Sequence, residues 1–466
     1  MIKRETSVVI IGGGPGGYEA ALVAAQLGAQ VTIVEKDGVG GAAVLTDCVP
    51  SKALIATADQ RADLDIAVRL GVSLGRNLQA PTEGVVARAS RINERILDLA
   101  AAQSRDIRRS LENVGVRVID GVGRLITRGL VRAETGNETV ELSADVVLIA
   151  TGATPRIMPT AVPDGERILT WQQIYALDEL PEHLVVIGSG VTGAELAQAY
   201  LGLGSAVTLV SSRERVLPGE DADAATLIEE VFRERGMEVL GKSRAQGVER
   251  SGDGVVVTLT DGRTVEGSHA LLAVGSVPQT AGLGLEEVGV EVAESGHIVV
   301  DRVSRTSVGG IYAAGDCTGV LPLASVSAMQ GRIAMWHALG DAVAPLNVRG
   351  VAANIFTDPE IATVGIGQRV ADETPDVQSV LLPLARNPRA KMQGIDAGFV
   401  KLFCRTGYGT ILGGVVVAPK ASELIFPVAL AVQNRLSVDA VASTITVYPS
   451  LSGSIAEAAR QLHQSE

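Results

Sequence analysis

The stretch Gly12-Gly13-Gly14-Pro15-Gly16-Gly17 decides the fold of this chain. It follows the apolar run Ser7–Ile11, which reads as a strand, and precedes the alanine-rich segment Tyr18–Leu27, which reads as a helix. Glycines at the first, third and sixth places permit a tight bend, close approach of a pyrophosphate, and close packing of the helix. We therefore predict a strand-turn-helix unit that holds a dinucleotide at its helix N-terminus.

The same unit occurs a second time, as Gly188-Ser189-Gly190-Val191-Thr192-Gly193 between a strand at Leu184–Ile187 and another alanine-rich segment. Two such turns in one chain predict two dinucleotides held at once, so that one can pass electrons to the other. Residues 51–113 are predicted to be mainly helical. The last ~120 residues carry no third glycine turn and read as a separate domain.

The two units carry different residues at the end of the strand that follows the turn and its helix. Glu35 stands 23 positions after Gly12 and is expected to accept the hydroxyls of a ribose. The same offset from Gly188 reaches Ser211, which is followed by Ser212-Arg213-Glu214-Arg215. Because serine and arginine can bind a 2′-phosphate that an acid would repel, we predict that the second site accepts NADPH, with NADH also usable. A solvated charged loop is the alternative.

Composition excludes several classes of protein. The 466 residues carry a net charge of −13 and only 3% aromatics, which argues against nucleic-acid binding. No apolar run is long enough for a membrane span, and we expect no targeting signal before the first strand. Cys48, Cys317 and Cys404 are far apart and odd in number, so neither a disulfide framework nor a zinc site is expected. A reducing cytoplasm is the predicted location.

Three motifs together resemble one family. The stretch from Gly40 to Lys52 resembles the redox-active segment of the pyridine nucleotide-disulfide oxidoreductases, which include dihydrolipoamide dehydrogenase and glutathione reductase. Ala150-Thr151-Gly152 and the segment from Ile311 to Asp316 match its two other FAD segments. The resemblance implies FAD at the first turn, NAD(P)H at the second, and a C-terminal domain that forms a homodimer.

The expected fold is α/β, with two Rossmann-like dinucleotide-binding domains and a C-terminal α+β interface domain. The expected domains are 1–155 and 281–345 for FAD, 156–280 for NAD(P)H and 346–466 for dimerisation. The catalytic candidates are Lys52, which the resemblance places beside the flavin and paired with Glu195, together with Tyr448 and Cys48. The cofactor-binding candidates are Gly12, Gly14, Gly17, Glu35, Gly41, Lys52, Gly123, Ala150, Thr151, Gly152, Asp316, Leu323 and Ala324 for FAD, and Gly188, Gly190, Val191, Thr192, Gly193, Ser211, Arg213 and Gly275 for NAD(P)H.

The chain departs from the family where sulfur chemistry is done. The family carries two cysteines five positions apart; this chain keeps Cys48 but has Ala43 at the earlier position, so no disulfide can form between them. At the C-terminus, Tyr448 and Gly453 occupy the positions of the family's histidine and glutamate. Neither Tyr448 nor Gly453 is a general base near neutral pH. Cys48 is expected either to tune the flavin or merely to pack.

Without a disulfide, electrons are expected to pass from FAD directly to a small acceptor. Planar quinones suit such a pocket, with Tyr448 as a hydroxyl donor. The segments around Cys48 and Tyr448 most resemble actinobacterial NAD(P)H:quinone reductases within the family. A soluble pyridine nucleotide transhydrogenase and a redox-sensing flavoprotein with little turnover are the alternatives.

Overall fold

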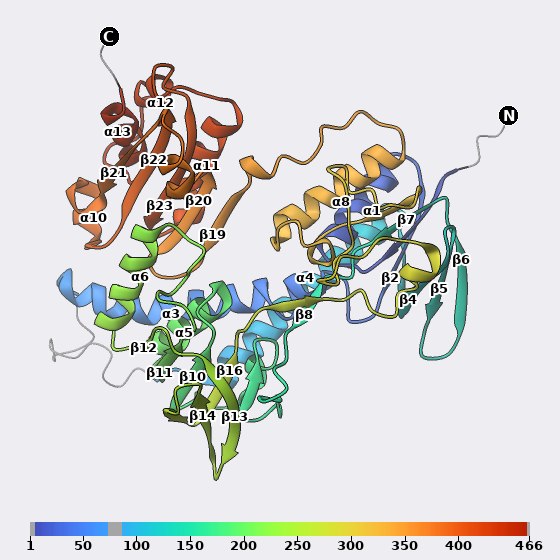
Figure 1. Cartoon of the computed structure of the whole chain (residues 1–466), viewed down its shortest axis with the longest axis horizontal. Coiled ribbons are helices and arrows are strands. Elements are labelled where there is room, and N and C mark those ends of the chain that lie inside the picture. The colour runs from blue at the N-terminus through green and yellow to red at the C-terminus, as the bar shows by residue number, and fades with distance from the viewer. Residues whose placement is uncertain (1–4, 73–85, 464–466) are drawn as a thin grey trace. The chain divides into compact units, whose positions relative to one another are not determined.

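A computed structural model of the chain describes residues 5–72 and 86–463, so part of the predicted helical region 51–113 lies outside the description. The chain divides into two compact units, each built from three separate segments. One comprises Met1–Ser51, Glu94–Arg156 and Gly275–Val348, and the other Lys52–Asn93, Ile157–Val274 and Arg349–Glu466. Figure 1 follows the chain through both units by colour.

The first unit is built on a five-stranded parallel sheet in the order β18-β7-β1-β2-β3. Its elements are β1 (Ser7–Ile11), α1 (Pro15–Gln26), β2 (Gln30–Glu35), α2 (Gly41–Leu45), β3 (Arg117–Asp120), β4 (Val122–Thr127), β5 (Leu130–Glu134), β6 (Thr139–Ser143), β7 (Val146–Ile149), β8 (Ala153–Pro155), β17 (Ser276–Pro278), α7 (Leu285–Val288), β18 (Ile311–Ala313) and α8 (Ala324–Ala338). Helices α3 (Cys48–Arg69) and α4 (Ala89–Asn113) each run from one unit into the other.

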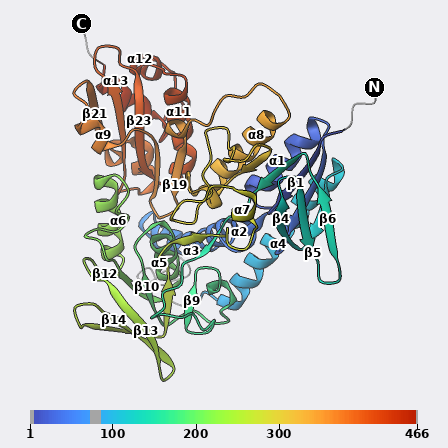
Figure 2. The ribbon, with the colours of Figure 1, turned by 45° about the vertical axis from the view of Figure 1, so that its right-hand side comes forward.

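Alternate side chains of β1 are buried in two different cores, one on each face of this sheet. Val8 and Ile10 are buried in a core that includes residues of α1 and α8, whereas Val9 and Ile11 are buried with residues of β4 and β5. Successive side chains of a strand point to opposite faces, so this pattern indicates helices on one face and the antiparallel sheet β4–β6 on the other. Both views show α1 beside α8 and the strands β4–β6 together (Figure 1, Figure 2).

The second unit repeats this plan on another parallel sheet, in the order β12-β11-β10-β16-β9. The elements of this part are β9 (Ile168–Thr170), β10 (His183–Ile187), α5 (Val191–Leu203), β11 (Ala206–Val210), α6 (Ala222–Glu234), β12 (Glu238–Leu240), β13 (Ala245–Ser251), β14 (Gly254–Leu259), β15 (Thr264–Gly267) and β16 (His269–Leu272). Val185 and Ile187 of β10 are buried with Val255 and Val257 of the antiparallel sheet β13–β15. The sequence repeat is therefore a repeat of architecture.

The C-terminal part of the second unit is an antiparallel sheet in the order β19-β20-β23-β22-β21. Its elements are β19 (Ala352–Ile355), β20 (Glu360–Gly365), α9 (Gln368–Asp372), β21 (Val377–Pro383), α10 (Pro388–Gln393), β22 (Phe399–Arg405), β23 (Ile411–Ala418), α11 (Ala421–Gln433), α12 (Val438–Ala442) and α13 (Gly453–Gln461). Ile425 and Val428 of α11 and Ile455 of α13 are buried in one core with the sheet. The predicted fold class, with two parallel-sheet nucleotide domains and a C-terminal α+β domain, is confirmed.

Short single turns interrupt these elements at Ile174–Ala176, Asp316–Thr318, Val348–Gly350 and Leu384–Arg386. The ends of predicted elements differ by a few residues from those observed, as for the predicted helix Tyr18–Leu27, which is observed at Pro15–Gln26. Within residues 5–72 and 86–463, no helix combines the length and apolarity needed to cross a bilayer.

Candidate active site

The first glycine turn joins β1 to α1 in the first unit. Gly12 has a φ of +101°, and a Cβ on it would collide with the carbonyl of Ala150. A Cβ on Gly17 would collide with the carbonyl oxygen of Gly12, whereas a Cβ on Gly14 would meet nothing within 4 Å. Gly12 and Gly17 therefore hold the turn closed against β7 and α1, and Gly14 leaves an open cradle at the N-terminus of α1. That arrangement fits a pyrophosphate.

The carboxylate of Glu35 organises the same turn. It is buried, accepts the backbone N–H of Gly13 at 2.5 Å through Oε2, and accepts that of Asp37 at 2.8 Å through Oε1. Each carboxylate oxygen has further lone-pair capacity. Glu35 thus stands beside the cradle with acceptor capacity suited to a ribose.

Three further FAD candidates follow β7, which pairs with β1, and β18, which pairs with β7. Thr151, after β7, donates its hydroxyl to the backbone oxygen of Gln279 at 2.7 Å, and a Cβ on Gly152 would meet nothing within 4 Å. Asp316 follows β18, and burial raises the pKa of its carboxyl, which has no hydrogen-bond partner among the described residues. Parallel strands end at the same sheet edge, so these groups gather near the first turn. An open backbone and an unpartnered carboxyl there fit FAD.

The other FAD candidates are placed as follows. Gly41 begins α2 and lies against Gly14, while Ala150 follows β7 and lies beside Gly12. Leu323 is the N-cap of α8 and Ala324 its first residue. Gly123 of β4 packs against Ile11 and Val34, so its missing side chain lets β4 approach the parallel sheet.

The second glycine turn repeats the first within the second unit. A Cβ on Gly188 would collide with the Ala273 carbonyl, and a Cβ on Gly193 with the Gly188 carbonyl oxygen. Gly190 and Gly275 are open, with nothing within 4 Å of a Cβ. Val191 and Thr192 form the first turn of α5. The same open cradle is present, and it fits a second dinucleotide.

The loop after β11 does not present Ser211 to solvent. Its hydroxyl is fully buried, 2.7 Å from the Ser189 hydroxyl, and it also accepts the backbone N–H of Arg213 at 3.2 Å. Arg213 and Arg215 are exposed, and Glu214 pairs with Lys242 at 2.7 Å. Ser211 therefore orders the loop. The exposed side chains of Arg213 and Arg215 are the cationic groups of this loop that an anion can reach.

Lys52 and Glu195 lie together in the second unit. The Lys52 Nζ donates to Glu195 Oε2 at 2.8 Å, and the Glu195 side chain is only 3% exposed. Glu195 Oε1 accepts the backbone N–H of Phe356 at 2.8 Å, and the Phe356 ring lies 5.0 Å from Lys52 Nζ. Sequence reasoning found the pair through resemblance but missed Phe356, because no local pattern marks a residue that acts through its backbone.

No disulfide links Cys48, Cys317 and Cys404, all of which lie in the described part of the chain. Cys48 is the first residue of α3, four positions before Lys52, and Ala43 lies on α2. Burial raises the pKa of the Cys317 thiol to about 11 and also raises that of Cys404. Neither of these two buried thiols is suited to attack at neutral pH. Among the described residues, no group of histidine, cysteine and acidic side chains could hold a metal ion.

Tyr448 borders a hollow in the C-terminal domain. The hollow has a volume of about 320 Å³ and is lined by Leu382, Pro383, Arg386, Asn387, Pro388, Thr446, Val447, Tyr448, Pro449, Ser450, Gly453, Ser454 and Glu457. Tyr448 is 82% exposed and precedes a cis proline. Asn387, which sequence reasoning missed, donates to the Ser450 backbone oxygen at 3.0 Å and to the Ser454 hydroxyl at 2.7 Å. Asn387 thus fixes the loop that carries Tyr448.

Comparison with known proteins finds relatives that match nearly the whole chain. Residues 6–331 match the pyridine nucleotide-disulphide oxidoreductase family, and residues 351–459 match its dimerisation domain. The chain is 57% identical to the NAD(P)H dehydrogenase (quinone) of Mycobacterium tuberculosis H37Rv, covering 98% of this chain and 94% of that one. It is 32% identical to the dihydrolipoyl dehydrogenase of Geobacillus stearothermophilus, covering 98% and 96%.

Solved structures agree. The crystal structure of LpdA from Mycobacterium tuberculosis superposes with a TM-score of 0.93 at 56% identity, covering 98% of this chain and all of that one. The HOCl-induced flavoprotein disulfide reductase RclA from Escherichia coli superposes with a TM-score of 0.86 at 26% identity, covering 97% and 99%. The chain therefore belongs to the pyridine nucleotide-disulfide oxidoreductase family of flavoenzymes.

Proposed function

We propose that this oxidoreductase transfers electrons from NAD(P)H through FAD to a quinone. The net reaction converts NAD(P)H, one proton and a quinone into NAD(P)⁺ and a hydroquinone. The observation that carries the proposal is a family scaffold with both nucleotide cradles, no disulfide among its three cysteines, and alanine at position 43. The relative named NAD(P)H dehydrogenase (quinone) supports the same acceptor class. When bound, FAD accepts hydride equivalents and passes electrons to a second substrate.

We assign the first turn to FAD and the second to the nicotinamide nucleotide. Gly14 and Glu35 would hold the pyrophosphate and a ribose of FAD, and Asp316 would bind its polar chain. Gly190 would cradle the pyrophosphate of NAD(P)H. The exposed Arg213 would contact a 2′-phosphate, with Ser211 keeping the loop in place, so NADPH is accepted and NADH remains usable.

Lys52 is proposed to act electrostatically on the flavin. Its charge is oriented rather than mobile, since Glu195 accepts from it at 2.8 Å and Phe356 lies beneath it. A fixed cation stabilises negative charge that develops nearby without reorganisation of water. Cys48, four positions earlier on α3, is proposed to tune the same environment.

Tyr448 is proposed to serve the acceptor. Its hydroxyl would donate to a quinone oxygen on which charge develops, a role that needs hydrogen-bond geometry and no redox-active thiol. We further propose a cytoplasmic homodimer joined through the domain at 346–466. Ile445, Val447 and Tyr448 are 97%, 78% and 82% exposed in this chain, an apolar group that a second copy would cover.

Steady-state kinetics of the purified flavoprotein test the proposal. A panel of benzoquinones and naphthoquinones is offered with NADPH or NADH, alongside lipoamide and a thionicotinamide analogue of NAD⁺. Efficient quinone reduction with negligible lipoamide turnover is expected. Fast hydride exchange to the thionicotinamide analogue with slow quinone reduction would instead identify a transhydrogenase, and flavin reduction without any efficient acceptor would identify a redox sensor.

A further inference from the structure

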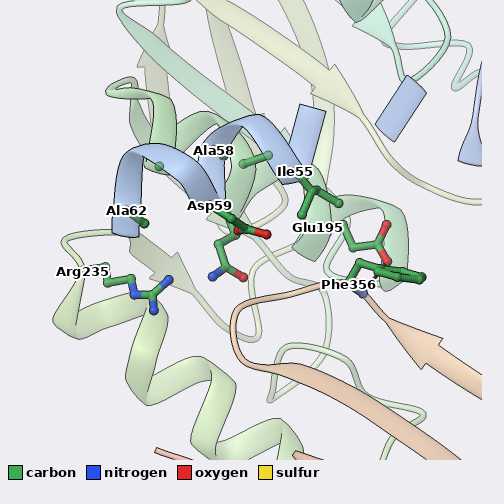
Figure 3. Close-up of a pocket in the computed structure, with 10 residues that line it drawn as sticks. Ile55, Ala58, Asp59, Ala62, Glu195, Arg235 and Phe356 are labelled. Atoms are coloured by element: carbon green, nitrogen blue, oxygen red, sulfur yellow. Dashed lines mark hydrogen bonds between the residues drawn. The ribbon is translucent and has the colours of Figure 1, made fainter. Parts of the chain in front are cut away.

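A small cavity in the second unit joins two carboxylates. It has a volume of about 20 Å³, room for a single water molecule, and lies between α3, α5 and the turn after β19. Asp59 of α3 and Glu195 of α5 both line it, together with Gln198, Arg235 and Phe356. In the view of Figure 3, Asp59 lies between Arg235 and Glu195. Glu195 is thus shared between this cavity and Lys52.

The charges that face Asp59 are mostly of its own sign. Asp63 lies one turn further along α3, and Asp358 and Glu360 come from the turn and strand after β19. The cation on this side is Arg235, which follows α6 and already donates to Asp358 at 2.7 Å. The Asp59 carboxylate has no hydrogen-bond partner among the described residues. Burial first, and then these acids, raise the pKa of Asp59 to about 7.

The turn from Phe356 to Asp358 connects Asp59 to the Lys52–Glu195 pair. Its Phe356 N–H donates to Glu195, and its Phe356 ring lies beneath Lys52. Its Asp358 donates its N–H to the Gln198 side chain and accepts from it, both at 2.8 Å. Asp358 is also the acid with the largest charge effect on Asp59. A negative charge on Asp59 therefore repels the turn that positions Lys52 and Glu195.

We propose that Asp59 is a positioning residue for the Lys52–Glu195 pair, whose proton keeps the Phe356–Asp358 turn in its present arrangement. Loss of that proton places a second negative charge at the cavity that Glu195 lines, and it pushes Asp358 away. The inference rests on the proposed action of Lys52 on the flavin. It assigns a role to Asp59, which belongs neither to the glycine turns nor to the segment around Cys48.

Unfolding as a function of pH tests the proton on Asp59 without any substrate. The folded protein holds this proton up to about pH 7, whereas the unfolded chain releases it near ~4, so stability from this group falls as pH rises between these values and is flat above. Asp59→Asn should therefore raise Tm by at least roughly 2 °C more at pH 8 than at pH 5. Asp63→Asn, on the exposed side of the same helix, is the matched control; it removes only a weaker repulsion on Asp59 than that of Asp358, so its difference between the two pH values should be much smaller.

Stopped-flow reduction by NADPH, with no acceptor present, tests the positioning role. The rate constant of the parent protein should fall by roughly threefold to tenfold as pH rises through about 7, and that of Asp59→Asn should stay at the low-pH value. Asp358→Asn should move the midpoint to lower pH and Arg235→Gln to higher pH. Both changes break the same ion pair, so a merely structural effect would move the midpoint in one direction.

Two results would overturn the inference: a shared pH profile for the parent and Asp59→Asn, or midpoint shifts of the same sign for Asp358→Asn and Arg235→Gln. Failure of the acceptor assignment is separable. It would leave the acceptor-free profiles and the unfolding data as expected while quinones are reduced poorly.

Discussion

The two glycine turns have the same backbone plan but differ in how the next strand ends. In both, the residue at the strand end reaches back to the second residue of the turn. Glu35 accepts the N–H of Gly13, and the Ser211 hydroxyl bonds the Ser189 hydroxyl. A Cβ on Gly13 would lie 3.2 Å from the Glu35 side chain, so a glycine accompanies the long acid, whereas a serine accompanies the short serine.

This comparison separates two tasks within one motif. The first, third and sixth glycines build the cradle, and they behave alike in both turns. The pair formed by the second turn residue and the strand end differs between the two units, and its members are 22 positions apart in each. We propose that this pair, together with Arg213, contributes to selection of the nucleotide.

The largest effect should come from closing the space at the sixth position. In Gly17→Ala or Gly193→Ala, the new methyl group meets a backbone carbonyl that cannot rotate away, at a cost of about 3 kcal/mol or more. We expect the first change to abolish FAD retention, and the second to spare FAD but abolish reduction by NADPH. Urea unfolding, flavin absorbance and stopped-flow reduction measure these outcomes.

Gly14→Ala and Gly190→Ala are the matched controls, because a Cβ at either position meets nothing within 4 Å. Their free energies of unfolding should lie within about 1 kcal/mol of that of the parent, while the corresponding nucleotide should bind more weakly. If the controls lose as much stability as the variants at the sixth position, the division between closed and open glycines is wrong.

Glu35→Gln should have the next largest effect. The amide keeps one accepting oxygen for the two backbone N–H groups of Gly13 and Asp37, so one of the two donors loses its partner, at about 1–3 kcal/mol. The apoprotein should be destabilised in urea by this amount, and flavin fluorescence should show faster FAD release. Unchanged apoprotein stability would mean that the carboxylate serves only the cofactor.

The glycine turns could be predicted from the sequence alone, whereas the contacts of the strand ends could be predicted only in part. The glycine turns are local, and their strands and helices follow from short-range periodicity, so the two nucleotide domains and Glu35 could be predicted. The burial of Ser211 could not, because its partner Ser189 is brought to it only by the pairing of β10 with β11. The sequence shows a serine there but not which way its hydroxyl points.

The Lys52–Glu195 pair shows a second limit of prediction from sequence. Lys52 and Glu195 are 143 positions apart, and only resemblance to a family joined them. Asp59 and Phe356 escaped notice because their roles depend on a cavity and a backbone N–H that tertiary packing alone creates. A charged residue on a helix is normally a solvated one, so no local signal distinguishes Asp59 from its exposed neighbour Asp63.

Replacing Ser189 and Ser211 by the residues at the matching positions of the first turn should shift the nucleotide preference towards NADH. Ser189→Gly combined with Ser211→Glu gives the second turn the pair of the first, and the new acid would repel a 2′-phosphate. We expect the ratio of kcat/KM for NADH to that for NADPH to rise about thirtyfold, or ~2 kcal/mol. The single variant Ser211→Glu is the control and should fold poorly, since Ser189 then crowds the acid. An unchanged ratio in a well-folded double variant would place selection elsewhere.

Arg213→Gln should have a smaller effect on the same selection. Loss of one exposed cation should raise KM for NADPH about tenfold while changing that for NADH less than twofold. The difference should shrink as ionic strength rises, because exposed charges are screened. Arg215→Gln, also exposed, tells whether the second arginine shares the phosphate, and equal changes with both nucleotides would exclude Arg213 from reading it.

Ser211→Ala should produce the smallest change, and its pattern is informative. The variant loses the hydroxyl contact with Ser189 and the acceptor for the Arg213 N–H, at about 1 kcal/mol. Because the loop then orders Arg213 less well, NADPH should be affected more than NADH even though Ser211 is buried. A double-mutant cycle with Ser189→Ala measures the coupling between the two hydroxyls, and we expect it to account for most of the loss in stability. Coupling near zero would mean that Ser211 acts through the Arg213 backbone alone. Glu35 and Ser211 would then share a position in their units but not a stabilising contact with the second residue of the turn.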